Sequence, residues 1–212
     1  MRKAVIVGHT GQDGYYLSSL LHKKKYEVIG ISSKQVSANT CKIAKVDILL
    51  MQDVEYLLRQ FQPDEIYFLA AVHQSSADKQ VDDGKLFQRS IDINIKALIH
   101  FLESIRLVSP VSKLFYAGSS HIFGSPAKVP QDESTPFYPN CIYGITKTAG
   151  IGACRFYRET HNIFASVGIC YNHESPLRES KYVSMKIVEA AVGIKKGFKN
   201  ELILGDLDAQ ID

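Results

Sequence analysis

Residues 4–14 read AVIVGHTGQDG and decide the fold, because a short apolar run passes directly into three glycines spaced as GxxGxxG. Glycine allows the tight turn and close backbone approach that a pyrophosphate needs. The N-terminus of the helix expected next offers unpaired N–H groups and a positive dipole end. A glycine triplet alone is weak evidence, but this one directly follows the first expected strand. The residues expected to hold a dinucleotide here are Gly8, Thr10, Gly11, Gln12, Asp13 and Gly14.

Short apolar runs alternate with amphipathic stretches along the rest of the chain. The pattern predicts strands over residues 4–7, 27–31, 42–46, 65–70, 113–117 and 164–171, and helices over 15–25, 53–61, 86–108 and 141–161. Asp53 is a candidate N-cap, and Lys23, Lys24 and Lys25 suit the C-terminus of a helix. Repeated βαβ units predict an α/β fold with a doubly wound parallel sheet of Rossmann type.

Composition excludes several classes of protein. The net charge is only +3, and apart from one run of three lysines the basic residues are scattered, so we expect no nucleic-acid partner. Cys41, Cys141, Cys154 and Cys170 show neither CxxC spacing nor paired histidines, so we expect reduced thiols and no metal site. Because no stretch resembles a signal peptide or a membrane span, we expect a cytoplasmic protein without membrane contact.

The end of the second strand bears on the choice of coenzyme. NAD-preferring sites usually place a carboxylate there to hold the ribose 2′-hydroxyl, but this strand ends in Ile31, Ser32, Ser33 and Lys34. Two serines followed by a lysine suit a 2′-phosphate better. We therefore expect NADP, with NAD possible, although Lys34 could equally be a solvated loop residue.

Tyr143 and Lys147 lie four residues apart near the start of an expected helix, and hence on one face of it. An ammonium beside a phenol stabilises the phenolate, which can exchange a proton with a hydroxyl or ketone while a nicotinamide carries hydride. Tyr182 and Lys186 repeat the spacing, but only the first pair follows a strand whose end carries Ser119. We expect Ser119, Tyr143 and Lys147 to be catalytic and Tyr182 to be a helix-surface residue.

Several longer segments carry a family resemblance. They are TGQDG (10–14), PDEIY (63–67), LAA (69–71), TPFYP (135–139), YGITK (143–147), NHESP (172–176) and LGDLDA (204–209). In these segments the chain resembles the extended short-chain dehydrogenase/reductases, and within them the GDP-mannose 4,6-dehydratases. The resemblance implies a lyase: NADP-dependent 4,6-dehydration of GDP-mannose or a related GDP-sugar through a 4-keto intermediate.

The resemblance also implies roles for single residues. The further coenzyme contacts that it implies are Asp47, Ile48, Leu69, Ala70, Ala71, Lys147, His173 and Arg178. Asn172 would touch the nucleotide sugar, together with Ser119 and Tyr143. From the residues alone, His173 could equally be a core histidine and Arg178 a loop cation.

Position 121 departs from the family pattern. Where the dehydratases carry a threonine and, two residues later, a glutamate base, this chain has Ser119 and His121. Histidine can serve as the base, since its unperturbed pKa of about 6.5 is closer to neutrality than that of a carboxylate. If His121 is not the base, the site suits a 4-epimerase or a 4-keto-sugar reductase. A non-catalytic NADP-binding protein is a third alternative, which the intact tyrosine and lysine disfavour.

The resemblance implies a domain boundary and a partner. Residues 1–171 would form the NAD(P)-binding domain, and residues 172–212 would begin a substrate-binding part that relatives continue further, so we expect a truncated chain. Ile211 stands where the family usually has arginine, which leaves the nucleotide open. In related enzymes the helices matching 86–108 and 141–161 contact a second subunit, so we expect a homodimer or higher homo-oligomer.

Overall fold

The computed structural model describes residues 1–33, 39–74, 78, 80–126 and 129–205. The chain divides into two compact units, Met1–Cys170 and Tyr171–Asp212, and each is described by itself.

The first unit is built on a six-stranded sheet in the order β3-β2-β1-β4-β5-β6, with every neighbouring pair parallel. The strands are β1 (Lys3–Val7), β2 (Glu27–Ile31), β3 (Lys42–Ile43), β4 (Glu65–Phe68), β5 (Lys113–Ala117) and β6 (Ala165–Gly168). This order is that of the doubly wound dinucleotide-binding fold. The predicted fold class is therefore confirmed.

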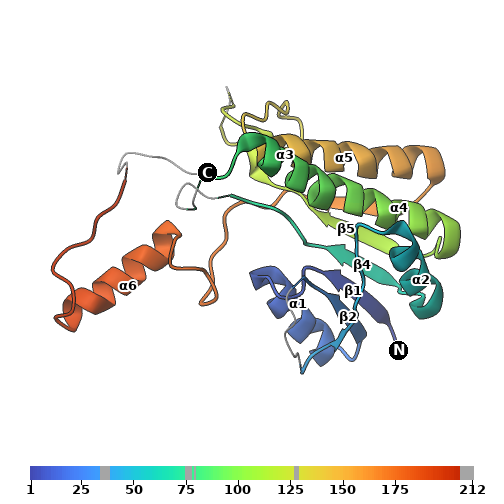
Figure 1. Ribbon diagram of the computed structural model, residues 1–212, viewed down its shortest axis with the longest axis horizontal. Coiled ribbons are helices and arrows are strands. Elements are labelled where there is room, and N and C mark those ends of the chain that lie inside the picture. The colour runs from blue at the N-terminus through green and yellow to red at the C-terminus, as the bar shows by residue number, and fades with distance from the viewer. Residues whose placement is uncertain (34–38, 75–77, 79, 127–128, 206–212) are drawn as a thin grey trace. The chain divides into compact units, whose positions relative to one another are not determined.

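Helices cover both faces of the sheet. They are α1 (Gln12–Lys23), α2 (Met51–Phe61), α3 (Asp83–Ile91), α4 (Ala97–Val108) and α5 (Ile142–His161). In Figure 1, α1 lies on one side of the sheet and α3, α4 and α5 lie on the other, with α2 packed against α4. Burial on both faces explains why the strands read as almost continuous apolar runs.

The two faces of the sheet have separate cores. On the α1 side, Ala4 and Ile6 pack with Leu21 of the helix. On the other side, the ring of Phe68 meets Phe101 of α4 edge to face, with 5.6 Å between centroids. Each such fully buried apolar side chain contributes about 1.5–3 kcal/mol to folding. Buried apolar side chains therefore pack both faces of the sheet.

Several boundaries differ from the prediction. β3, β4 and β6 end earlier than expected, and β3 retains only two residues. The proposed N-cap was wrong, because Leu50 occupies that position and Asp53 lies inside the first turn of α2. The Asp53 carboxylate instead accepts a hydrogen bond from the backbone N–H of Asp47, at 3.2 Å.

The predicted helix over residues 86–108 is a longer, composite helix. It begins at α3, where the side chain of Asp82 accepts a hydrogen bond from the backbone N–H of Lys85. A five-residue π-helical segment, η1 (Asp92–Lys96), then joins α3 to α4. π-helical turns inside longer helices are frequent at functional sites. Here the widened turn contains the fully buried Asn94.

The second unit contains α6 (Val183–Lys195). Tyr182 is the N-cap residue of α6, and the guanidinium carbon of Arg178 lies 3.6 Å from the centroid of its ring. Tyr182 is therefore a partly buried residue at the helix start. None of the helices in the described ranges has the length and apolar character needed to cross a membrane.

Candidate active site

The glycine loop is shaped by two positions where a side chain does not fit. Gly8 has φ of +92°, and a Cβ placed on it would lie 2.8 Å from the backbone nitrogen of Ala70. A Cβ on Gly14 would lie 2.5 Å from the Cα of His9. Gly11 is the N-cap of α1, and its N–H donates to the carbonyl of Gly8 at 3.1 Å. The loop can therefore bring bare backbone and the N-terminus of α1 close to a ligand.

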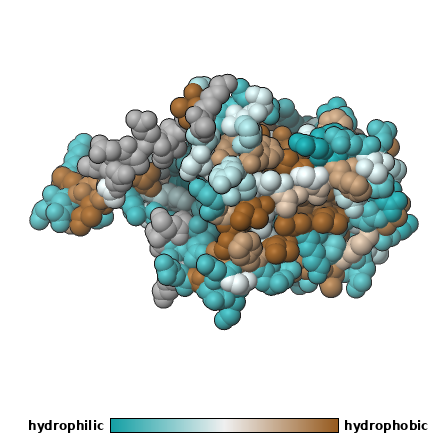
Figure 2. Space-filling view, turned by 90° about the horizontal axis from the view of Figure 1, so that it is seen from above, coloured by the Kyte–Doolittle hydropathy of each residue, from teal (hydrophilic) through white to brown (hydrophobic). Residues whose placement is uncertain are grey.

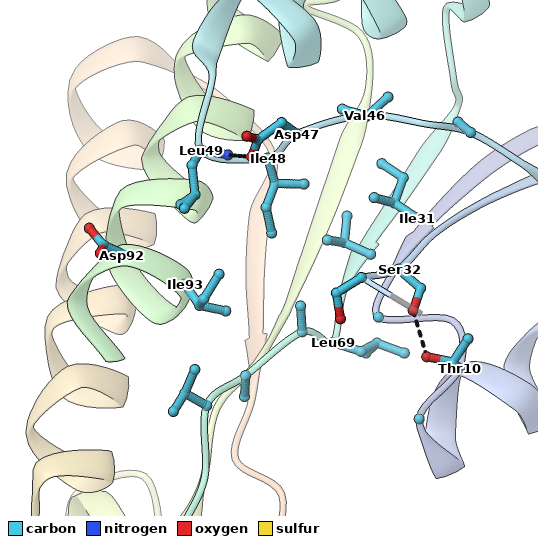
Figure 3. Close-up of a pocket in the computed structure, with 18 of the residues that line it drawn as sticks. Thr10, Ile31, Ser32, Val46, Asp47, Ile48, Leu49, Leu69, Asp92 and Ile93 are labelled. Atoms are coloured by element: carbon cyan, nitrogen blue, oxygen red, sulfur yellow. Dashed lines mark hydrogen bonds between the residues drawn. The ribbon is translucent and has the colours of Figure 1, made fainter. Parts of the chain in front are cut away.

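A groove of about 1250 Å³ opens beside this loop (Figure 3). Small-molecule sites usually measure roughly 300–1,000 Å³, so the groove has room for a dinucleotide. The predicted coenzyme residues that line it are Gly8, Thr10, Gly11, Asp47, Ile48, Leu69, Ala70 and Ala71. Gln12, Asp13 and Gly14 form the first turn of α1 instead.

Two hydrogen-bonded loops form opposite walls of the groove in Figure 3. The hydroxyls of Thr10 and Ser32 are 2.7 Å apart and hydrogen-bond to each other, which ties the glycine loop to the end of β2. The carboxylate of Asp47 accepts the backbone N–H of Leu49 at 2.9 Å. Ser33 also lines the groove, whereas Lys34 lies outside the described residues. The end of β2 thus presents hydroxyls where an NAD-preferring site usually has a carboxylate.

Some groove residues that the sequence analysis missed come from the helices. Arg89, Asp92 and Ile93 reach the groove from α3 and η1. Helical periodicity shows that a stretch has two faces, but it does not say which polar residues meet a ligand. An Arg and an Asp three residues apart also read as an ordinary solvated pair.

Lys147 is the most constrained of the predicted catalytic residues. Its side chain is 1% exposed, and its Nζ donates a hydrogen bond to the carbonyl of Ala117 at 2.7 Å. The same nitrogen lies 5.5 Å from the centroid of the Tyr143 ring. Burial lowers the pKa of Lys147 from 10.5 to about 8, and the thiols of Cys170 and Cys154 oppose this fall. The lysine can therefore change its charge near physiological pH.

Ser119 and His121 lie on the segment that follows β5. Ser119 caps the short 3₁₀ helix η2 (Ser120–Ile122), with its hydroxyl accepting the backbone N–H of His121 at 3.2 Å. Cys141 caps α5 by accepting the N–H of Gly144, and its Sγ also lies 3.6 Å from Nδ1 of His121. The start of α5, which carries Tyr143, is thereby fixed against η2.

Three aromatic rings meet at this point. The rings of His121 and Tyr143 have centroids 5.7 Å apart. A second imidazole, His73, lies 4.8 Å from the Tyr143 centroid and 6.1 Å from that of His121. The structure thus brings together the predicted Ser119, His121, Tyr143 and Lys147. His73 was not foreseen, since a histidine in a loop carries no pattern of its own.

Asn94 links the groove to these rings. Its side-chain oxygen accepts the N–H of Val72 at 2.8 Å, and its side-chain nitrogen donates to the Val72 carbonyl at 3.3 Å. The same nitrogen donates to the hydroxyl of Thr146 on α5 at 2.9 Å. A buried amide with three partners holds the loop after β4 in one position relative to α5.

The remaining predicted residues belong to the second unit. Nδ1 of His173 hydrogen-bonds to the carbonyl of Tyr171 at 2.8 Å, and Arg178 pairs with Glu174 at 3.4 Å. Asn172 lies in the same segment. The predicted roles of Asn172, His173 and Arg178 stay predictions.

Doubly wound sheets of this strand order bind dinucleotides outside the carboxyl ends of their strands, where the glycine loop and groove lie here. With a tyrosine and a lysine one helical turn apart next to that crevice, the molecule is a short-chain dehydrogenase/reductase of the extended type. The model of the GDP-mannose 4,6 dehydratase family matches residues 5–212. The chain belongs to that family.

Individual relatives agree with this assignment. The GDP-mannose 4,6-dehydratase of Yersinia enterocolitica is 32% identical over 230 residues, covering 100% of this chain and 60% of that protein. GDP-mannose 4,6 dehydratase 2 of Arabidopsis thaliana is 36% identical, covering 99% and 60%. The chain thus spans about 60% of the length of these curated relatives.

Solved structures share the fold. UDP-glucuronic acid 4-epimerase from Bacillus cereus, in complex with NAD, superposes with a TM-score of 0.76 at 21% identity, covering 91% of this chain and 63% of that one. dTDP-glucose 4,6-dehydratase from Bacillus anthracis, also in complex with NAD, gives 0.75 at 18% identity, covering 91% and 61%.

Proposed function

We propose that this chain carries the coenzyme site and catalytic residues of a nucleotide-sugar 4,6-dehydratase, a lyase that acts on GDP-mannose or a related GDP-sugar with NADP. Membership of the GDP-mannose 4,6 dehydratase family supports the reaction. The observation that carries the proposal is the cluster of Ser119, His121, Tyr143 and Lys147 at the carboxyl edge of the sheet.

The groove fits the coenzyme. Gly8 and Gly11 would bring backbone close to the pyrophosphate at the N-terminus of α1, and Asp47 and Ile48 would border the adenosine half. Ser33 and Lys34 would meet the 2′-phosphate. His173 and Arg178 are further proposed coenzyme contacts. The coenzyme supplies oxidation of C4 and reduction of C6, and NAD can replace NADP in the same chemistry.

The protein side chains move the protons. Tyr143 accepts the proton of the C4 hydroxyl while Ser119 hydrogen-bonds to the same oxygen. Lys147 in its charged form stabilises the phenolate that this step requires. Once C4 is a ketone, the C5 proton becomes acidic, and His121 removes it as water leaves from C6. Asn172 would hold the nucleotide sugar.

The test uses the full-length gene product and GDP-mannose, with the alkali-induced ultraviolet absorbance of a 4-keto sugar as the readout. We expect product from the wild-type protein and from His121→Glu, and at least about 100-fold less from His121→Ala. His22→Gln, an exposed position on α1, is the matched control. Retained formation of the 4-keto sugar by His121→Ala would remove His121 from the mechanism. Conversion of the nucleotide sugar by the wild-type protein without a 4-keto product would favour 4-epimerisation or 4-keto reduction. Coenzyme binding without turnover of any nucleotide sugar would favour a non-catalytic protein.

We also propose that residues 1–171 bind the coenzyme, that residues 172–212 begin the substrate-binding part, and that the enzyme works in the cytoplasm, where its coenzyme and nucleotide sugars are found.

A second copy of the chain is the partner that we propose for the outer face of α3, α4 and α5. Figure 2 looks onto these helices and shows apolar side chains gathered over them. On these helices Ile91, Ile99, Ile145 and Phe156 are 37–53% exposed. Contiguous exposed apolar surface of this kind marks a protein interface. Light scattering should give the mass of a dimer or higher oligomer, and Phe156→Asp should lower it, whereas a wild-type monomer contradicts the proposal.

A further inference from the structure

His73 occupies a position that the proposed function leaves unused. It follows β4, so it comes from a different loop than His121, yet both imidazoles reach the ring of Tyr143. The His73 ring stands edge-on to the tyrosine, at an interplanar angle of 86° with 4.8 Å between centroids. Two imidazoles therefore flank the phenol that receives the C4 proton.

The backbone that leads into His73 is held at two places. Ala70 packs against the glycine loop, where Gly8 leaves no room for a side chain. Val72, the residue before His73, gives both its N–H and its carbonyl to Asn94. The His73 ring thus meets Tyr143 from a fixed backbone, as a group with a chemical role must.

The 4,6-dehydration of a sugar needs an acid as well as a base. The base removes the C5 proton, but the C6 hydroxyl leaves easily only as water, and hence only after it gains a proton. Imidazole can act in either sense near neutral pH. We propose that His73 is the acid that protonates the departing C6 hydroxyl while His121 accepts the C5 proton, an inference that rests on the proposed dehydratase function.

The step balances in atoms and charge. The C5–H and C6–O bonds break, a C5=C6 double bond forms, the C5 proton goes to His121, and the C6 oxygen leaves as water with the proton of His73. A coenzyme bound in the groove would supply the transfer of hydride from C4 to C6, so no net oxidant would be consumed. His121 then returns its proton to C5.

One proton transfer remains to close the cycle. At this stage Tyr143 holds the proton that it took from the C4 hydroxyl, and His73 lacks the proton that left with water. Passing one proton from Tyr143 to His73 restores both residues for the next turnover. The edge-on contact of the two rings, with 4.8 Å between their centroids, keeps both residues in the same small region for this transfer.

Neighbouring groups are already engaged. The Sγ of Cys141 accepts the N–H of Gly144 and caps α5. The Nζ of Lys147 donates to the carbonyl of Ala117 in the buried layer beneath the rings. Of the two imidazoles that meet Tyr143, His121 already accepts the C5 proton in the proposed function, so we assign the acid to His73.

The test compares two leaving groups in the full-length protein. GDP-mannose loses water from C6, whereas its 6-deoxy-6-fluoro analogue loses fluoride, which departs without being protonated. We expect His73→Gln to lower turnover of GDP-mannose by at least about 100-fold, and to keep fluoride release within about 3-fold of the wild type. His121→Gln should lose activity on both substrates, and the control His22→Gln on neither.

Each outcome separates the inference from the function beneath it. An equal loss of activity on both substrates would mean that His73→Gln only damages the structure. Unchanged turnover of GDP-mannose would mean that His73 has no catalytic role. Either result overturns this inference and leaves the proposed function standing. If the wild-type protein releases neither 4-keto sugar nor fluoride, the proposed function fails as well. NADPH titration by fluorescence, expected within about 3-fold of wild type for His73→Gln, confirms that the groove is intact.

Discussion

Lys147→Met should change how the stability of the protein depends on pH. Burial lowers the pKa of Lys147 from 10.5 to about 8, so the folded protein binds this proton less tightly than the unfolded chain does. Because the unfolded state holds more protons between pH 8 and 10.5, this lysine makes stability rise with pH across that interval. Below pH 8 the buried ammonium lowers the free energy of unfolding by about 3 kcal/mol, because each unit of pKa shift corresponds to about 1.36 kcal/mol.

Urea unfolding followed by circular dichroism, at pH 7 and pH 10, measures the effect. The free energy of unfolding of the wild type, minus that of Lys147→Met, should increase by about 2–3 kcal/mol from pH 7 to pH 10. Cys154, whose pKa burial raises to about 12, is present in both proteins, so its contribution largely cancels. A difference that stays constant within about 0.5 kcal/mol would refute the argument that burial disfavours the charged lysine.

Three further predictions concern packing, the loop after β4 and the coenzyme. Gly150→Ala should lower the free energy of unfolding by about 1–2 kcal/mol, because its Cβ would lie 2.6 Å from the ring of Tyr116. The higher helix propensity of alanine offsets only about 1 kcal/mol of the cost of this clash. Gly152→Ala should instead raise the free energy of unfolding by about 1 kcal/mol, because the added methyl has no neighbouring atom within 4 Å. Equal urea midpoints for the two variants would contradict both predictions. Asn94→Ala should lower the free energy of unfolding by about 2–4 kcal/mol, because buried polar groups lose their hydrogen-bond partners. It should also weaken NADPH binding in a fluorescence titration. Unchanged binding would show that the loop after β4 does not affect the coenzyme. Ser33→Asp should shift the preference from NADPH toward NADH at least about 10-fold, and an unaltered ratio of dissociation constants would place the 2′-phosphate elsewhere.

The parts of the fold that the sequence predicted are those with a local signal. The run 4–14 contains both a buried strand and the glycines that its turn requires, so β1 and the start of α1 could be located within three residues. The length of β3 could not, because it lies at the edge of the sheet, where only pairing with β2 decides how far a strand extends. Asp53 was misassigned since an acidic residue in the first turn of a helix resembles an N-cap in sequence.

The site divides in the same way. Tyr143, Lys147 and Ser119 follow from spacing on one helix and from the end of one strand. His73 and Asn94 gain their importance from neighbours more than 20 positions away along the chain, so neither has a local pattern. That Asn94 is buried within a π-helical turn can be recognised only from the three-dimensional structure.

The position of β4 between β1 and β5 explains why one short loop can serve both halves of the site. The segment from Leu69 to His73 leaves the sheet between the glycine loop and η2, so its first residues line the coenzyme groove and its last residue meets Tyr143. Asn94 fixes the middle of the segment by holding both backbone groups of Val72. Only two residues separate Ala70, which lines the groove, from His73, which meets Tyr143. Because Asn94 holds the residue between these two positions, a variant such as Asn94→Ala should weaken coenzyme binding and disturb the position of His73 together.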